Sequence, residues 1–182
     1  HVGNGLILTN RHVAERIGRQ AQVSFSDGRL VHGQVVAICK QADLAAIYSK
    51  DAISYPSVDV ADRPVVAGET VWRVGYPVST GRRIEQASGQ MRGVVGVSWG
   101  QSNQIDMRCS SGDSGSGIYN ASAQLVGVLW GGDSGGTTAC TYKDTVCFLN
   151  EQCVRWWRRP QLKPPQQPGP TVLNPPTVPP SS

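Results

Sequence analysis

The sequence lacks any long apolar segment and has little charge of one sign. No apolar run approaches the ~20 residues that a helix needs to cross a bilayer, so no membrane-spanning helix is expected. Charged residues make up 16% of the 182 residues, and the net charge of +4 is partly due to basic residues late in the chain. So small an excess does not favour a nucleic-acid partner and is typical of a solvated chain end.

Metal-ligand spacing is also missing. The five cysteines form no CxxC pair, and the three histidines lie far from Cys140 and Cys147, so the spacing of these two does not match a zinc pattern; we expect no metal and no cofactor. An odd number leaves at least one cysteine unpaired within the chain. Cys140 and Cys147 are spaced to close a short hairpin loop. Whether the cysteines form disulfides is left open by the sequence; disulfides would favour an oxidising compartment.

What the sequence does contain, from Gly5 onward, is a series of short β-branched and apolar stretches between glycine, asparagine, aspartate and proline. Residues 21–25 and 30–38 flank a turn at Asp27-Gly28 and predict a hairpin. Further strands are expected at residues 70–74, 93–99, 117–119 and 124–130. Such spacing indicates an all-β sandwich or barrel rather than a βαβ fold.

One short helix is expected near the end of the folded part. Leu149, Cys153, Trp156 and Trp157 repeat at helical spacing and predict one packed face, with Asn150 as the cap at its start. Pro160 would end it.

Composition then changes abruptly. Nine of the twelve prolines lie in residues 160–182, which predicts an extended linker or tail after a single domain of residues 1–159. Because the chain begins with His1 rather than methionine, we interpret it as a fragment or processed product whose signal peptide would not be visible. A further domain beyond Ser182 is a possible partner of this tail.

Three local patterns carry chemistry. A strand ends in Thr9-Asn10-Arg11-His12, which places a base of near-neutral pKa on a rigid element. Asp43 begins a second apolar strand, where its carboxylate can orient an imidazole through Nδ1. Ser114 lies in a glycine-rich turn whose Gly112 and Ser114 N–H groups can point at one spot as an oxyanion hole.

Together these motifs, with Gly-Asp-Ser-Gly-Ser around Ser114, resemble chymotrypsin-like (trypsin-superfamily) serine proteases, closest to the HtrA-type and glutamyl-endopeptidase-type branch. The resemblance covers residues 3–159. It implies two antiparallel six-stranded β-barrels followed by the short helix, although the opening strand of the first barrel is missing from the sequence. It also implies a serine endopeptidase whose triad is His12, Asp43 and Ser114, acting on a polypeptide substrate.

The resemblance further implies a specificity pocket. Its walls would be Arg108, Cys109 and Ser110 on one side and Leu129, Trp130, Gly131 and Gly132 on the other. No aspartate stands at the base of this pocket, which argues against a preference for lysine or arginine. An apolar or small residue at the cleavage point is expected, with an acidic one, held by Arg108, as the alternative.

Ser134 offers a competing nucleophile, since Gly132-Asp133-Ser134-Gly135-Gly136 matches the protease signature slightly better than the residues around Ser114. Only Ser114 is followed by two apolar strands joined by a turn at Asn120-Ala121-Ser122, the hairpin that the pocket requires, and we therefore prefer Ser114.

Other readings remain. The domain is alternatively a catalytically silent, protease-like module that binds a protein partner. It is otherwise a processing protease cut from a longer polyprotein, or a secreted protease with a C-terminal attachment module. A secreted or cell-envelope location is expected for the protease. His1 and His32 are interpreted as structural or surface residues.

Overall fold

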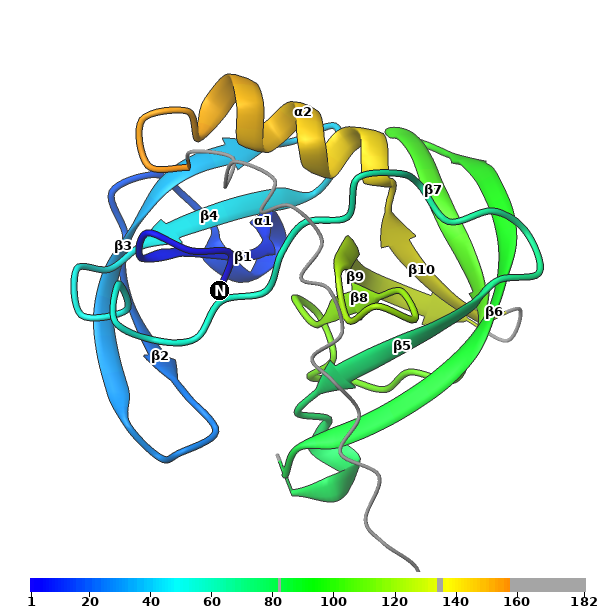
Figure 1. Cartoon of the computed structure of the whole chain (residues 1–182), viewed down its shortest axis with the longest axis horizontal. Helices are drawn as coiled ribbons and strands as arrows, with labels where there is room; N and C mark the ends of the chain where they lie inside the picture. Colours follow the sequence, from blue (N-terminus) through cyan, green and yellow to red (C-terminus); the bar gives the residue numbers. More distant parts are fainter. Residues whose placement is uncertain (82, 134–135, 158–182) are drawn as a thin grey trace, which may run out of the picture.

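The computed structural model describes residues 1–157 except residues 82, 134 and 135. It contains two β units side by side, with one helix lying across both (Figure 1). The first unit is an antiparallel sheet of four strands in the order β1-β4-β3-β2. Its strands are β1 (Leu6–Asn10), β2 (Gln20–Ser24), β3 (Leu30–Cys39) and β4 (Leu44–Tyr48), and the short helix α1 (Arg11–Ala14) follows β1 directly.

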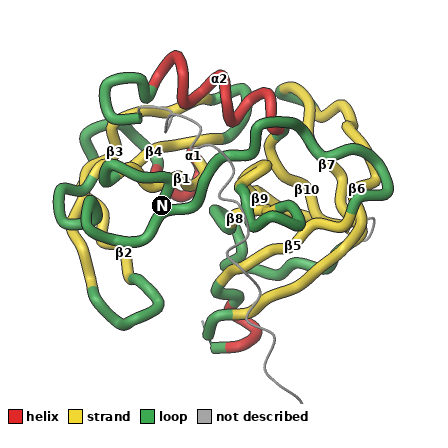
Figure 2. The backbone as a smooth tube through the Cα atoms, viewed as in Figure 1, coloured by secondary structure: helices red, strands yellow, loops and turns green. Residues whose placement is uncertain are grey.

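The second unit is a closed antiparallel barrel of six strands in the order β10-β7-β6-β5-β8-β9. Its strands are β5 (Thr70–Gly75), β6 (Glu85–Val97), β7 (Gly100–Asp106), β8 (Gly117–Tyr119), β9 (Leu125–Asp133) and β10 (Gly136–Cys140). A single turn of 3-10 helix, η1 (Val78–Thr80), lies between β5 and β6. The tube in Figure 2 shows the loop between β4 and β5 running from one unit to the other.

The prediction of two six-stranded barrels is therefore correct for the second unit and wrong for the first. The first sheet is open, with β1 and β2 as its edges in the described part of the chain. Residues 49–69, between β4 and β5, form turns and loops with a single bridge from Val60 to Leu125, so they add no strand. Pro56 and Pro64 lie in this stretch, where a missing backbone N–H opposes strand pairing.

The expected strands follow from period-two burial. Along β3, side chains alternate between exposed and buried over its first six residues. The hairpin of β2 and β3 is confirmed, and Gly28 in its turn has a φ of 82° that favours glycine. The Asp27 carboxylate accepts a hydrogen bond from the Arg29 N–H at 3.0 Å, which holds the turn closed.

The helix α2 (Tyr142–Gln152) exists, but it begins earlier than predicted. The Thr141 hydroxyl caps it by accepting a hydrogen bond from the Asp144 N–H at 3.1 Å, so Asn150 lies inside the helix and is not its cap. The predicted packing face is buried at Leu149, Cys153 and Trp157, of which Cys153 and Trp157 follow the helix. Pro160 and the predicted proline-rich linker lie outside the described residues.

This helix closes the core that joins the two units. Phe148 and Leu149 of α2 pack in one cluster with Leu44 of the first sheet and Val128 of the barrel. Phe148 is 2% exposed, so its ring is removed from water by both units at once.

The cysteines do not pair with one another. All five fall within the described residues and all are free thiols. Cys140 ends β10 and Cys147 lies in α2, so the hairpin loop expected between them is wrong. Among the described residues, no helix is long and apolar enough to cross a membrane.

Candidate active site

His12 lies in α1, directly after β1, and lines a cavity between the two units that is described below. Asn10, the last residue of β1, is fully buried and donates a hydrogen bond from its side-chain amide to the Asp43 carbonyl at 3.2 Å. The Arg11 N–H donates to the same carbonyl at 2.8 Å. The backbone that carries His12 is thus fastened to the residue that precedes β4.

Asp43 orients His12 through both carboxylate oxygens. Its Oδ2 lies 2.6 Å from His12 Nδ1, and its Oδ1 accepts a hydrogen bond from the His12 N–H at 3.1 Å. Asp43 has a φ of 50°, a left-handed conformation that aspartate tolerates better than most residues, and it is 6% exposed. Because Oδ2 can only accept, Nδ1 must carry the proton and Nε2 is left as the basic nitrogen.

Ser114 is half-buried in the loop between β7 and β8, flanked by Gly112 with a φ of 94° and Gly115 with a φ of 91°. In this loop, the N–H groups of Asp113, Gly115 and Ser116 donate to backbone carbonyls. Within the described residues, the N–H groups of Gly112 and Ser114 have no such acceptor. The two donors predicted for an oxyanion hole are therefore uncommitted in the described structure.

The structure brings the elements that carry His12 and Ser114 together. A Cβ placed on Gly115 would lie only 2.7 Å from the Thr9 hydroxyl, so the loop that carries Ser114 is in close contact with the end of β1. The Ser114 hydroxyl donates to the Trp130 carbonyl at 3.4 Å and makes no hydrogen bond to His12 among the described residues. The predicted His12–Asp43 contact is therefore present, while a direct His12–Ser114 hydrogen bond is not.

A cavity of about 260 Å³ lies beside this pair, between the two units. Trp99 and Trp130 form its barrel wall, with their rings in edge contact at 5.1 Å between centroids. The Trp130 indole N–H donates to Ser102 Oγ at 3.0 Å, which fixes the ring. The first unit supplies the remaining lining residues from α1 and from the turn between β3 and β4: Arg11, His12, Lys40 and Asp43.

Sequence reasoning missed three of these lining residues. Trp99 was expected at the end of a strand, but β6 ends at Val97 and Trp99 stands in the turn before β7. Arg11 belongs to the motif that ends in His12 but was given no role, and Lys40 precedes the motif that contains Asp43. An exposed tryptophan in a tight turn is the one signal that could have singled out this wall, since large apolar side chains are seldom left in turns.

The predicted specificity pocket is only partly assembled around this cavity. Of its seven residues, Trp130 lines the cavity. Cys109 and Gly132 do face each other, because a Cβ on Gly132 would lie 2.4 Å from the Cys109 Sγ. Leu129 is 1% exposed, so its side chain belongs to the barrel core and only its backbone, bonded to the N–H of Gly115, reaches the loop.

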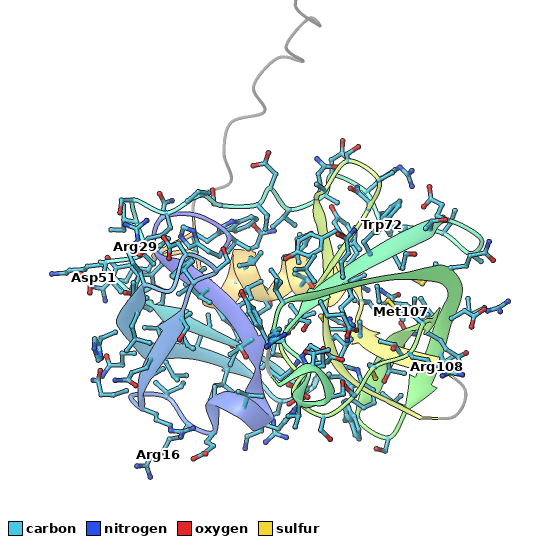
Figure 3. The ribbon with its side chains drawn as sticks, turned by 90° about the horizontal axis from the view of Figure 1, so that it is seen from below. Arg16, Arg29, Asp51, Trp72, Met107 and Arg108 are labelled. Carbon is cyan, nitrogen blue, oxygen red and sulfur yellow. The ribbon has the colours of Figure 1, made fainter. Side chains whose placement is uncertain are left out.

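The remaining pocket residues lie at the surface of the barrel. Ser110 and Arg108 are exposed, and Gly131 is half-buried on β9. Figure 3 shows Arg108 on the barrel half of the molecule, opposite the half that carries Arg16, Arg29 and Asp51. Ser134 lies outside the described residues. The part of the chain that the structure describes holds no cluster of three or more potential metal ligands.

Comparison with known proteins gives consistent matches. The family model described as "Trypsin-like peptidase domain" matches residues 1–128. Serine endoprotease DegS of Escherichia coli K12 is 29% identical over 128 residues, 68% of this chain and 36% of DegS. The periplasmic pH-dependent serine endoprotease DegQ of the same organism is 24% identical over 132 residues, 70% of this chain and 29% of DegQ.

Among solved structures, the HtrA-type protease AlgW with a decapeptide matches with a TM-score of 0.73 at 22% sequence identity. The match covers 84% of this chain and 49% of AlgW, and supports the fold. The chain spans little more than a third of the length of the DegS relatives that it matches.

Proposed function

Because this chain belongs to the trypsin-like peptidase domain family, as its motifs predicted, we propose that it is a serine endopeptidase that hydrolyses peptide bonds through an acyl-enzyme. The observation that carries the proposal is the 2.6 Å contact between His12 Nδ1 and Asp43 Oδ2. That contact leaves Nε2 as a free base on the side of the molecule where the Ser114 loop meets β1.

In the proposed reaction, Ser114 Oγ turns from the Trp130 carbonyl toward His12 and attacks the substrate carbonyl carbon. His12 Nε2 takes the hydroxyl proton, and Asp43 stabilises the imidazolium that forms. The N–H groups of Gly112 and Ser114 donate to the developing oxyanion. His12 then passes its proton to the leaving amine, and a water molecule, activated by the same base, hydrolyses the ester to regenerate Ser114.

Specificity for an apolar or small side chain at the cleavage point is the second part of the proposal. Cys109 and Gly132 stand on facing walls of the proposed pocket, and Cys109 Sγ would lie only 2.4 Å from a Cβ on Gly132, so the two walls are in contact there and leave no room for a large side chain. An acidic side chain held by the exposed Arg108 remains the alternative. Profiling cleavage of a peptide mixture would separate these two preferences.

We also propose a location in the cell envelope or outside the cell. Support comes from the relatives, since DegQ is named as a periplasmic enzyme. The free state of all five cysteines removes disulfides as an argument for an oxidising compartment.

The test is labelling with a fluorophosphonate probe, which reacts only with an activated serine. Wild type should be labelled, Ser114→Ala should not, and Ser134→Ala should label at close to the wild-type rate. Labelling that persists in Ser114→Ala would assign the nucleophile elsewhere. A folded wild type without labelling would favour the silent, partner-binding domain, for which the Ser114–Trp130 hydrogen bond is the observation in favour.

A further inference from the structure

Arg73, in the middle of β5, is the largest fully buried side chain among the described residues. Its side chain is 1% exposed, and a guanidinium in such a place is costly unless charged partners surround it. Two carboxylates supply them. Nη1 donates a hydrogen bond to Asp113, whose side chain is 0% exposed, and Nη2 donates one to Glu85 at the start of β6.

Asp113 links this charge to the nucleophile loop, because it directly precedes Ser114. Its Oδ2 also accepts a hydrogen bond from the Ser110 N–H at 2.9 Å, and its backbone carbonyl accepts from the Ser116 N–H at 2.9 Å. Asp113 therefore ties both ends of residues 110–116 to β5, Ser110 through its side chain and Ser116 through its backbone. Asp113 is the only charged residue among residues 110–116.

The end of β5 is shaped to receive the loop. Gly75 lies two residues beyond Arg73, and a Cβ there would be 2.3 Å from Ser116 Oγ and 2.8 Å from Asp113 Oδ1. The loop thus lies against the strand with no space between them. Any movement of Asp113 relative to Arg73 would be transmitted to Ser114 and Gly112, its immediate neighbours.

We propose that Arg73 is a positioning residue of the peptidase. Its buried pair with Asp113 holds the loop in the conformation that leaves the Gly112 and Ser114 N–H groups free for the oxyanion. Without Arg73, Asp113 would be a buried carboxylate without its main counter-charge. The loop would relieve this by turning Asp113 toward water, which would misplace the two N–H donors. The inference rests on the proposed peptidase function.

A purely structural role makes a different prediction. If the pair only stabilised the barrel, its loss would lower the free energy of unfolding, while the folded fraction would keep its kcat. A positioning role instead lowers kcat with little change in KM. It also weakens the binding of inhibitors that form a tetrahedral adduct, because those place an oxygen in the oxyanion hole.

The experiment compares Arg73→Met, Arg73→Lys and the double variant Arg73→Met/Asp113→Asn with wild type. Arg92→Met is the matched control, since Arg92 also pairs with an aspartate of the barrel but is 56% exposed. For each protein, kcat and KM on a cleaved peptide, the inhibition constant of a peptide boronate and thermal unfolding are measured.

Arg73→Met should lose about 100-fold in kcat, the effect typical of one lost oxyanion donor, with KM changed by only a few-fold. Boronate affinity should fall in parallel. Arg73→Lys keeps a positive charge but cannot bond both carboxylates as the guanidinium does, so its kcat should lie between those of Arg73→Met and wild type. The double variant should recover at least tenfold of the loss, because it removes the uncompensated charge, and Arg92→Met should match wild type.

Folded Arg73 variants with wild-type kcat and boronate affinity would overturn the inference. So would variants that all fail to fold, since the pair would then be a requirement for folding. These outcomes differ from failure of the proposed function, in which wild type itself would not be labelled at Ser114 by a fluorophosphonate.

Discussion

Replacing Asp43 with asparagine probes the pair of contacts on which the proposed base depends. In the structure, Oδ1 accepts from the His12 backbone N–H and Oδ2 lies 2.6 Å from His12 Nδ1. An asparagine amide offers one acceptor and one donor in the same two places. Keeping the backbone hydrogen bond puts the NH₂ against Nδ1, which then must accept, and the proton moves to Nε2. The imidazole would be held in place with its proton on the wrong nitrogen.

The expected loss in kcat is about 10⁴-fold, the size seen when this tautomer is inverted in a serine protease. At about 1.4 kcal/mol per factor of ten, this is roughly 5–6 kcal/mol of transition-state stabilisation. Protein stability should change much less, because the substitution keeps the shape of the side chain. The assay is the rate of fluorophosphonate labelling, which requires no knowledge of the substrate, followed by kcat on a cleaved peptide.

Asp27→Asn is the control, because Asp27 lies in the turn between β2 and β3, forms an exposed pair with Arg29 and is remote from His12. It should label at the wild-type rate. If Asp43→Asn folds and labels within tenfold of wild type, the reasoning from the tautomer is refuted, and His12 does not act as the base in the way described.

Three further predictions concern the frame of the site. Burial raises the pKa of Cys140 and Cys153 to about 12, so both thiols stay neutral at pH 8, and a thiol reagent should label at most three of the five cysteines until denaturant is added. Phe148→Ala should lower the free energy of unfolding by about 3–5 kcal/mol in urea denaturation, because the ring is buried between both units. Gly115→Ala should slow labelling by about 100-fold, because its φ of 91° and its 2.7 Å approach to Thr9 force the loop to shift, whereas labelling at the wild-type rate would mean that this contact is dispensable.

The parts of the fold that were predictable from sequence are those with local causes. The Asp27-Gly28 turn and the alternation in β3 are read from neighbouring residues, and β8 was predicted with its observed bounds. The openness of the first sheet was not predictable in this way, because strand count depends on which segments pair across the whole chain. The predicted start of α2 was wrong because the prediction rested on apolar spacing, which continues beyond the end of the helix. It did not use the capping pair of Thr141 and Asp144, which marks the true start.

The candidate site shows the same division. His12 and Asp43 were chosen from motifs and are in contact. Arg73 had no such motif, since a single arginine in a strand is ordinarily exposed, and only the fold brings it to Asp113, forty positions away. Leu129 was assigned to the pocket by its place in a motif, but inward-facing positions of a small barrel are filled by core side chains.

The placement of α2 has a consequence for how the molecule comes apart. The hydrophobic cluster around Phe148 and Leu149 contains residues of both the open sheet and the barrel, so it is not the core of either unit alone. Loss of either unit would expose the apolar face of the helix and remove part of the other unit's core. The two halves of a site divided between separate sheets should therefore melt in a single cooperative transition, with equal calorimetric and van't Hoff enthalpies. A helix remote from the candidate site would in that way keep the proposed base and the proposed nucleophile in one thermodynamic unit.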